Sequence, residues 1–267
     1  MVKIAVINQK GGTGKTTSTI NIAGCLDSEL RKKVLVVDCD ASINASRYLL
    51  TDDEEIPEDD DNLDSIQTIV DVLNNGAKVE DVIRRVILRK RNIIQTNIYV
   101  LPAQKQMEEL CSFEGDYVLR DALSPLESEF DYCIFDCPPH MTDFAYEAMA
   151  CSQYIIVPAF ADTDSLGGFD TLIEHVNRFK QTLVNTELDI LGIFFTNVNA
   201  QNALAKHYMS EYDQSDIVFN SKIRASSAIG QARYFGKPIT YYKRSSPVAK
   251  DYVALTKEIV KRIRKRR

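Results

Sequence analysis

Two lysines, three glycines and three threonines stand within nine residues near the start of the sequence. The run is Gln9-Lys10-Gly11-Gly12-Thr13-Gly14-Lys15-Thr16-Thr17, with the apolar stretch Val2–Asn8 before it and a helical pattern after it. In a tight glycine-rich turn, successive backbone N–H groups bind phosphate oxygens, and the start of the next helix adds its amides and positive dipole end. We expect Lys15 to reach the β- and γ-phosphates of a nucleotide and the Thr16 hydroxyl to bind Mg²⁺.

One position of this loop departs from the common phosphate-loop pattern GxxxxGK[ST]. Gln9 stands where the first glycine is usual, and Lys10 adds a second lysine just before the paired glycines. A single phosphate chain bound in a monomer has no evident need for two lysines in one short loop. Lys10 therefore either has a further task or points to solvent.

Carboxylates follow two strand-like runs. Val34–Asp38 leads to Asp40, and Tyr132–Asp136 ends in an aspartate itself. In open α/β sheets ligands collect at the carboxyl ends of the strands, which is where these side chains are expected. A single aspartate in such a place often caps a turn or a helix. Beside a phosphate loop, we expect Asp40 and Asp136, together with Thr16, to hold Mg²⁺ and its waters.

The segment Lys10–Thr16 resembles the deviant Walker A loop, KGGxGK[ST], of the ParA/Soj and MinD ATPases. The resemblance implies that ATP and Mg²⁺ bind here and that two copies of the chain form an ATP-dependent homodimer. It also implies that Lys10 crosses the interface to the phosphates of the partner's nucleotide, where it supplies positive charge as an arginine finger does. Lys10, Lys15 and Asp40 are then the expected catalytic residues of an ATPase that is slow without a partner.

Two further segments are similar to the switches of this family. Asp40-Ala41-Ser42-Ile43-Asn44 resembles its DPQGN segment, which implies that Asp40 orients the attacking water and the Mg²⁺ shell. Asp136-Cys137-Pro138-Pro139 resembles its DCPP segment, which implies that Asp136 bonds a metal-bound water, although His140 stands where serine is usual. Because both segments are altered, a nucleotide-binding scaffold that hydrolyses little is an alternative.

Weaker similarities follow in the same order along the chain. Leu101-Pro102-Ala103 and Phe235-Gly236-Lys237-Pro238-Ile239 resemble the strand-ending PA and the late FGKP turn of the family. Leu191–Asn197 resembles the strand whose end meets the adenine, which implies that Asn197 binds the nucleotide. The cluster cysteines of nitrogenase-iron-protein-like relatives are not clearly present. The resemblance covers most of the chain.

The C-terminal segment 222–267 is strongly basic. It holds fourteen Lys or Arg residues and two acidic ones, whereas the whole chain has a net charge of −6. Such a balance attracts phosphate-rich polymers or anionic lipid surfaces. Basic residues spread over several elements favour sequence-independent binding to duplex DNA. The expected DNA contacts are Lys222, Arg224, Arg233, Lys237, Lys243 and Arg244.

A membrane-associated function is the other alternative that this segment leaves open. Val248, Tyr252, Leu255, Ile259 and Ile263 recur at helical spacing, as in a MinD-like helix that lies on a membrane. An ordinary helix packed on the sheet explains the same stripe, and we expect no membrane partner. The family resemblance implies a ParB-like centromere-binding partner that triggers hydrolysis.

An acidic run contrasts with the basic end of the chain. Eight of the ten residues from Asp52 to Asp61 are carboxylates, and mutual repulsion predicts a solvated surface loop over residues 51–64. The six cysteines include no CxxC pair, which indicates reduced thiols. No stretch approaches about 18 consecutive apolar residues and no secretory leader is recognisable, so we expect a cytoplasmic, nucleoid-associated protein.

Strand-like and helix-like segments alternate nearly throughout the 267 residues. The predicted strands are Val2–Asn8, Val34–Asp38, Ile98–Leu101, Tyr132–Asp136, Tyr154–Pro158 and Ile190–Asn197. The predicted helices are 16–30, 77–91, 104–111, 115–128, 165–185, 200–213 and 246–265. The alternation predicts one three-layer α/β domain over 1–267, a mostly parallel twisted sheet flanked by helices. Together with the loop, this is the fold of a P-loop NTPase of the deviant Walker A type.

Overall fold

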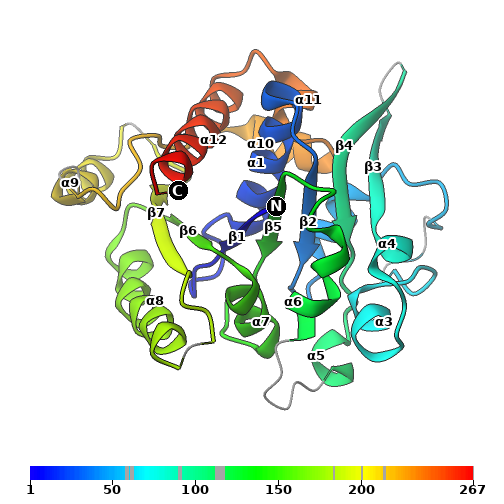
Figure 1. Ribbon diagram of the computed structural model, residues 1–267. Helices are drawn as coiled ribbons and strands as arrows, with labels where there is room; N and C mark the ends of the chain where they lie inside the picture. Colours follow the sequence, from blue (N-terminus) through cyan, green and yellow to red (C-terminus); the bar gives the residue numbers. More distant parts are fainter. Residues whose placement is uncertain are drawn as a thin grey trace.

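A central sheet organises the computed structural model, which describes residues 1–57, 60, 63–89, 92–111, 118–182, 184–199, 201–212 and 215–266 (Figure 1). In these residues seven strands form the sheet in the order β3-β4-β2-β5-β1-β6-β7. Strand β3 runs antiparallel to β4, and the other neighbouring pairs are parallel. The strands are β1 Val2–Val6, β2 Val34–Asp38, β3 Arg84–Arg89, β4 Ile93–Leu101, β5 Tyr132–Asp136, β6 Tyr154–Ala159 and β7 Asp189–Phe195.

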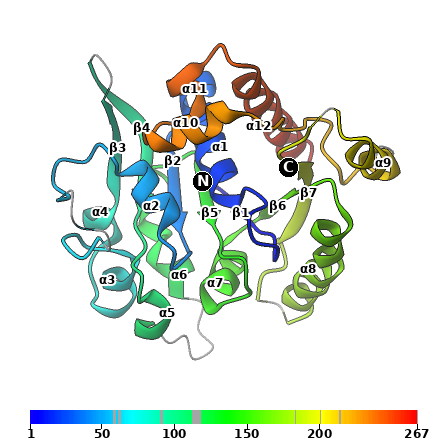
Figure 2. The same ribbon diagram turned by 180° about the vertical axis from the view of Figure 1, so that it is seen from behind.

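Helices cover both faces of this sheet (Figures 1 and 2). Helices α1, α2, α10, α11 and α12 lie over one face, while α6, α7 and α8 lie over the other. The helical segments are α1 Lys15–Leu30, α2 Asn44–Leu49, α3 Ile69–Asn74, α4 Val79–Val82, α5 Met107–Leu110, α6 Val118–Ala122, η1 Ser124–Leu126 (a 3₁₀ turn), α7 Asp143–Cys151, α8 Thr163–Gln181, α9 Ala203–Tyr212, α10 Ser227–Tyr234, α11 Ile239–Lys243 and α12 Pro247–Arg266.

The predicted three-layer α/β fold is confirmed. Every residue of β1, β2, β5 and β6 is buried, as continuous apolar runs covered on both faces require. The in-register pair Asp38↔Asp136 brings the carboxyl ends of β2 and β5 together. All parallel strands end at the edge where the glycine-rich loop leaves β1, so the sheet itself gathers the expected site residues.

The predicted helix 77–91 is wrong beyond its first turn. Helix α4 ends at Val82, and residues Arg84–Arg89 form β3 at the edge of the sheet. Val86 and Leu88 are buried while Arg85 and Arg89 are partly exposed, which is the alternation of a strand with one covered face. The prediction also missed α2, α3, α7, α10 and α11. Of the predicted helix 115–128, residues 115–117 lie outside the described part of the chain.

The first carboxylates of the acidic run are paired rather than solvated. Arg84 Nε lies 2.8 Å from Asp53 Oδ2, and the Arg89 backbone N–H donates to Asp52 Oδ2 at 2.5 Å. Lys237 Nζ lies 3.7 Å from the same Asp52 oxygen. The side chains of Asp52 and Asp53 are only 18% and 14% exposed, because the basic edge strand β3 neutralises them. Residues 58, 59, 61 and 62 are outside the described part of the chain.

Candidate functional site

The glycine-rich loop between β1 and α1 has a backbone that glycine adopts far more readily than other residues. Gly12 and Gly14 have φ angles of +78° and +89°, in the left-handed region. Gly14 is also the N-cap of α1, and it has no side chain to occupy the first amides of that helix. These amides and the positive end of the α1 dipole are therefore available to an anion.

Two side chains, Asn8 and Thr196, fasten the loop to the ends of neighbouring strands. Asn8 Nδ2 donates to the Pro158 carbonyl at 2.8 Å, and Asn8 Oδ1 accepts from the Lys10 N–H at 2.8 Å. Thr196 Oγ1, just after β7, donates to the Thr13 carbonyl at 2.8 Å. The loop is thus tied to β6 and β7 as well as to β1, and its shape is set before any ligand arrives.

Lys15 folds back over this loop. Its ammonium donates to the carbonyls of Asn8 at 2.9 Å and Lys10 at 3.3 Å. Burial lowers the pKa of Lys15, and the nearby charge of Asp136 opposes the shift, followed by those of Cys137 and Asp40. Among the described residues, the hydrogen bonds of this ammonium go to backbone carbonyls, so the charged oxygens of a phosphate chain would be stronger acceptors than it has now.

Asp136 at the end of β5 has the environment of a metal-water ligand. Thr19 Oγ1 donates to its Oδ1 at 3.1 Å, while its Oδ2 is buried and has no hydrogen-bond partner among the described residues. Burial, followed by the charge of Asp38, raises the pKa of this carboxyl. A buried carboxylate oxygen without a partner is costly, and a water of a Mg²⁺ shell would satisfy it. The residues present therefore fit the predicted cation.

The two aspartates that follow β2 have different surroundings. Asp38 is fully buried and accepts hydrogen bonds from the Ser46 N–H at 2.8 Å and the Ser46 hydroxyl at 2.7 Å, so it anchors α2. Asp40 is half-buried and accepts from the Ser42 N–H at 2.8 Å. Its charge acts on both Lys15 and Asp136. Asp40, Lys15 and Asp136 thus lie near enough for their charges to act on one another, and the altered Ala41-Ser42 pair lies in the turn after Asp40.

Lys10 has a partner that the sequence analysis missed. Its ammonium lies 3.1 Å from Asp162 Oδ2 and 3.2 Å from Oδ1 of the same chain, and 5.9 Å from the centroid of the Phe160 ring. Asp162 follows β6 at the same edge of the sheet. In this conformation Lys10 is neither directed to solvent nor free to act elsewhere. An aspartate shortly after a buried strand was the available signal.

A cavity of about 210 Å³ adjoins the loop. Its lining comprises Gly12, Thr13, Gly14, Thr17, Phe160, Thr196, Asn197, Ile223, Arg224, Ser226, Ile229, Gly230 and Tyr252. Asn197, a predicted nucleotide-binding residue, is among them and has a left-handed φ of +51°. The residues from 223 onwards had not been predicted here, because α10 and α12 approach the loop only through the fold. A larger cavity of about 700 Å³ lies elsewhere, and Asp52, Asp53 and Glu54 line it, which disfavours a triphosphate.

At least four of the six residues predicted to contact DNA have partners within the same chain. Arg224 binds Asp251 at 2.6 Å and lines the cavity, while Lys237 is largely buried against Asp52 and the Arg89 carbonyl. Arg244 pairs with Glu29 at 2.8 Å, and Arg233 donates to Asn44 at 3.1 Å. Lys243 is exposed and Lys222 is half-buried. Several of these cations therefore stabilise the fold.

The apolar stripe of the last helix is not available to a membrane. Val248, Tyr252, Leu255, Ile259 and Ile263 are each at most 2% exposed. They lie on the side of α12 that packs toward α1 and β7. The structure thus favours the ordinary packed helix over the membrane-lying one. Within the described residues, none of the helices has the length and apolar character needed to span a bilayer.

Comparisons with known proteins agree with this geometry. A family described as an AAA domain matches residues 1–190. The sporulation initiation inhibitor protein Soj of Bacillus subtilis is 30% identical over 96% of this chain and 97% of its own length. The chromosome partitioning protein ParA of Myxococcus xanthus is 30% identical over 97% of this chain and 88% of its own.

Solved structures show the same fold. The ATP complex of Cyanothece McdA(D38A) superposes with a TM-score of 0.79 at 20% identity, covering 98% of this chain and 96% of that one. Pyrococcus horikoshii MinD with Mg-ADP gives 0.74 at 26% identity, covering 97% and 96%. The resemblance seen in the phosphate loop is thereby confirmed over nearly the whole length, and the chain belongs to the ParA/Soj family of partition ATPases.

Proposed function

We propose that this protein partitions DNA by an ATP-driven cycle of dimerisation. ATP with Mg²⁺ joins two copies, the dimer binds duplex DNA without sequence preference, and hydrolysis separates the copies. The observation that carries the proposal is the convergence of Lys15, Asp40 and the unpartnered Oδ2 of Asp136 beside a loop that also holds Lys10. One lysine suffices to bind the phosphates, so the second is explained by a contact with the other copy's nucleotide.

Each residue of the site has a defined task in this cycle. The backbone amides of residues 11–16 bind the phosphate chain, and Lys15 exchanges its carbonyl partners for phosphate oxygens. Thr16, Asp40 and Asp136 would hold Mg²⁺, which when bound withdraws charge from the phosphates. Asp40 also orients the attacking water, which its half-buried carboxylate beside Lys15 suits it to do. Lys10 places its positive charge on the partner's transferring phosphoryl group after leaving Asp162.

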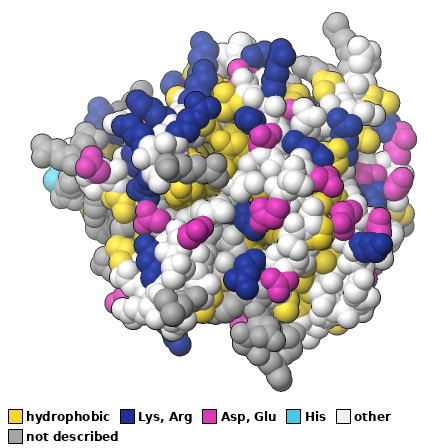
Figure 3. Space-filling view, viewed as in Figure 1, with side chains coloured by type: hydrophobic (Ala, Val, Ile, Leu, Met, Phe, Trp, Pro, Cys, Tyr) yellow, Lys and Arg dark blue, Asp and Glu magenta, His cyan; other side chains and the backbone are white. Residues whose placement is uncertain are grey.

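The DNA surface that the fold supports best is the exposed face of α12. Besides Arg266, which pairs with Asp189, its exposed cations among the described residues are Lys250, Lys257, Lys261, Arg264 and Lys265. Their spacing of seven, four, three and one places them along one face, about 22 Å from first to last at 1.5 Å per residue. The two acidic residues of the helix, Asp251 and Glu258, are half-buried and paired with Arg224 and Arg262. Figure 3 shows the resulting gathering of Lys and Arg over α12.

Dimerisation would connect this surface to the nucleotide. Two copies of the α12 face, held in one particle, bind a DNA duplex with an avidity that exceeds the single affinity by about a hundredfold. Contacts to phosphates alone make the binding independent of sequence and sensitive to salt. A ParB-like centromere-binding partner would stimulate hydrolysis and release the protein, which would otherwise be associated with the nucleoid.

DNA retardation with ATP, ADP or no nucleotide, at two salt concentrations, tests the proposal. We expect retardation with ATP alone, with a salt slope of about −9 for five phosphate contacts from each of the two copies. The double substitution Lys257→Gln, Lys261→Gln should weaken binding, while Lys237→Gln, whose ammonium faces Asp52, should not weaken it in the same way. Binding that ignores the nucleotide, or no binding at all, would contradict the proposed function.

A further inference from the structure

One wall of the cavity beside the phosphate loop is held in place from α12. Residues 217–224 run along the edge of β7, where Ile193 N–H donates to the Ile217 carbonyl at 2.9 Å and Val198 N–H to the Ile223 carbonyl at 2.9 Å. Ile223 and Arg224, at the end of this stretch, line the cavity. This part of the wall is thus a segment hydrogen-bonded along the edge of β7, and its position depends on its contacts with α12.

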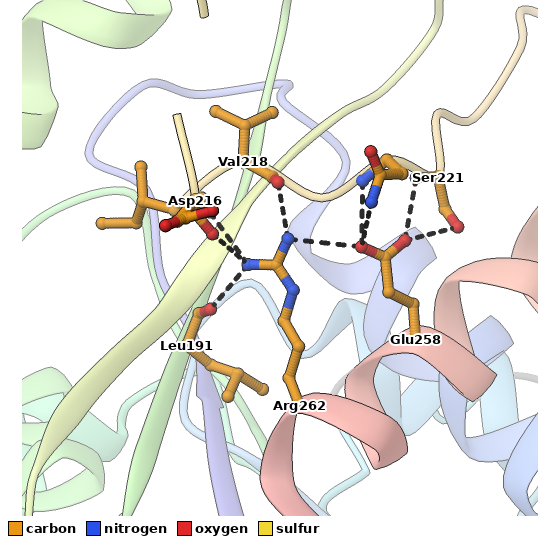
Figure 4. Close-up of polar contacts among 8 residues, drawn as sticks. Leu191, Asp216, Val218, Ser221, Glu258 and Arg262 are labelled. Atoms are coloured by element: carbon orange, nitrogen blue, oxygen red, sulfur yellow. Dashed lines mark hydrogen bonds and ion pairs between the residues drawn. The ribbon is translucent and has the colours of Figure 1, made fainter. Parts of the chain in front are cut away.

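Arg262 fixes the first half of that segment (Figure 4). Its guanidinium donates to the carbonyls of Leu191, Asp216, Ile217 and Val218 at 3.2, 2.9, 3.3 and 2.5 Å. It also lies 4.0 Å from the centroid of the Phe219 ring. Only arginine presents enough donors in a rigid planar fork to hold several carbonyls at once.

The close approach of the segment to β7 also requires a glycine. A Cβ at Gly192 would lie 2.4 Å from the Ile217 carbonyl oxygen and 2.8 Å from Arg262 Nη1. Both distances are shorter than any ordinary contact, so a side chain here would push the segment or the guanidinium away. The glycine in β7 therefore leaves room for both the segment and the Arg262 guanidinium.

Glu258 and Asp251 fix the second half. Glu258 accepts from the N–H groups of Asn220 and Ser221, both at 2.9 Å, and its Oε1 lies 3.2 Å from Arg262 Nη2 (Figure 4). Asp251 accepts from Arg224 three times: from Nε at 2.6 Å, from Nη2 at 2.8 Å and from the backbone N–H at 3.2 Å. Arg224, the donor of all three bonds, is itself a residue of the cavity wall.

These three charged residues share one face of α12. They are seven and four residues apart, which is the spacing of successive helical turns. Between them on the buried side, Tyr252 lines the cavity, and its hydroxyl lies 3.4 Å from Ser18 Oγ of α1. One helix therefore holds the cavity wall and also contacts the helix that begins at the phosphate loop.

We propose that Asp251, Glu258 and Arg262 are positioning residues of the nucleotide site, which hold residues 217–224 as the wall against which the base and sugar of the nucleotide pack. The inference rests on the proposed function for the existence of that site. The phosphate loop binds the phosphates without help from this wall, whereas the remainder of the nucleotide needs it. Substituting these three residues should therefore lower the affinity for nucleotides and leave the affinity for a bare phosphate chain nearly unchanged.

Isothermal titration calorimetry with Mg²⁺ and either ATP, ADP or inorganic tripolyphosphate tests this inference. Asp251→Asn keeps the shape of the side chain but removes the charge that holds Arg224. We expect about tenfold weaker ATP and ADP binding, the loss of a charge-assisted hydrogen bond, and less than about a twofold change for tripolyphosphate. Arg262→Gln should likewise lower the affinities for ATP and ADP much more than the affinity for tripolyphosphate. Asp121→Asn, at an exposed aspartate of α6 on the other face of the sheet, is the matched control and should change the affinity for none of the three ligands.

The outcomes separate the inference from the proposed function. An Asp251→Asn protein that binds ATP as the wild type does, or that loses tripolyphosphate as strongly as ATP, overturns the positioning role. Thermal melting of each variant shows whether a loss reflects general destabilisation, which would lower all three affinities together and count against the inference. A wild-type protein that binds neither ATP nor tripolyphosphate refutes the proposed function, and the inference with it.

Discussion

Lys10 and Asp162 of one protomer form an ion pair, with the ammonium 3.1 and 3.2 Å from the two carboxylate oxygens. In the proposed cycle, Lys10 must leave this carboxylate before it can reach the other copy's nucleotide. The pair is partly exposed, with side-chain exposures of 31% and 39%, so its net stabilisation is small. It therefore opposes dimerisation slightly without preventing it.

Asp162→Asn should make dimerisation easier. The variant removes the charge that holds Lys10 in its own protomer, so the ATP concentration at half-maximal dimerisation should fall about two- to fivefold. Analytical ultracentrifugation over an ATP titration measures the midpoint. Asp121→Asn, at an exposed ion pair with Arg120 on α6, is a control that should leave the midpoint unchanged. A midpoint that rises in the Asp162 variant would show that the aspartate assists the dimer instead.

Asp40→Ala should trap an ATP-bound dimer. The half-buried carboxylate beside Lys15 is assigned to the attacking water, so its loss should lower phosphate release by about 100-fold or more while ATP still binds. Phosphate release and size-exclusion chromatography on the same sample give both quantities. Unchanged turnover in this variant would remove Asp40 from the reaction. That result would indicate that the altered segments, with Ala41-Ser42 and His140, belong to a different catalytic arrangement.

Asp136→Asn should stabilise the metal-free protein and abolish its response to Mg²⁺. The native carboxylate is buried with an unpartnered oxygen, and a neutral amide of the same shape avoids the cost of burying its charge. We expect a melting temperature about 2–4 °C higher in EDTA. Mg²⁺ should no longer tighten ATP binding, as titration with and without the metal would show.

A well-paired aspartate provides the control for that substitution. Asp131 accepts from Lys32 at 2.8 Å and from the Lys33 N–H at 2.9 Å, so Asp131→Asn should lower the melting temperature. If both variants lose stability equally, Asp136 is an ordinary structural carboxylate and the metal assignment is wrong.

Glu147→Gln should alter the pH dependence of stability. Glu147 is buried, its Oε2 accepts from the Leu119 N–H at 2.9 Å, and burial raises its pKa from 4.5 to about 7. Between these values the folded protein keeps a proton that the unfolded chain has lost, so stability falls as the pH rises through this range. The variant should melt about 2–6 °C higher than the wild type at pH 8 and close to it at pH 5. The same difference at both pH values would mean that Glu147 is not buried in its protonated form.

The sheet and the phosphate loop were predictable because local pattern determines them. Buried runs such as Val34–Asp38 read as strands, and the loop between β1 and α1 has a distinctive composition. The edge strand Arg84–Arg89 was mistaken for helix because its few apolar residues suit either period, and only pairing with β4 decides between them.

The remainder of the site arises from contacts between distant segments. Asp162 meets Lys10 from 152 residues away. An aspartate shortly after a buried strand indicates a place at this edge of the sheet, but neither local sequence indicates which cation it pairs with. The cavity wall near Arg224 is placed by charged residues of α12 that look like ordinary surface residues in the sequence. The predicted DNA contacts show the same limit: the sequence shows how many cations there are, and the fold decides which of them are paired, as Arg224 and Lys237 are.

Light scattering of the Asp40→Ala protein with saturating ATP and Mg²⁺ tests the central claim most directly. The account predicts about twice the 30.2 kDa chain mass with ATP, single chains with ADP, and single chains with ATP once Lys10→Ala is added. Single chains at saturating ATP, or a Lys10→Ala protein that dimerises as readily, would contradict the claim that this lysine and the triphosphate join two copies of the molecule.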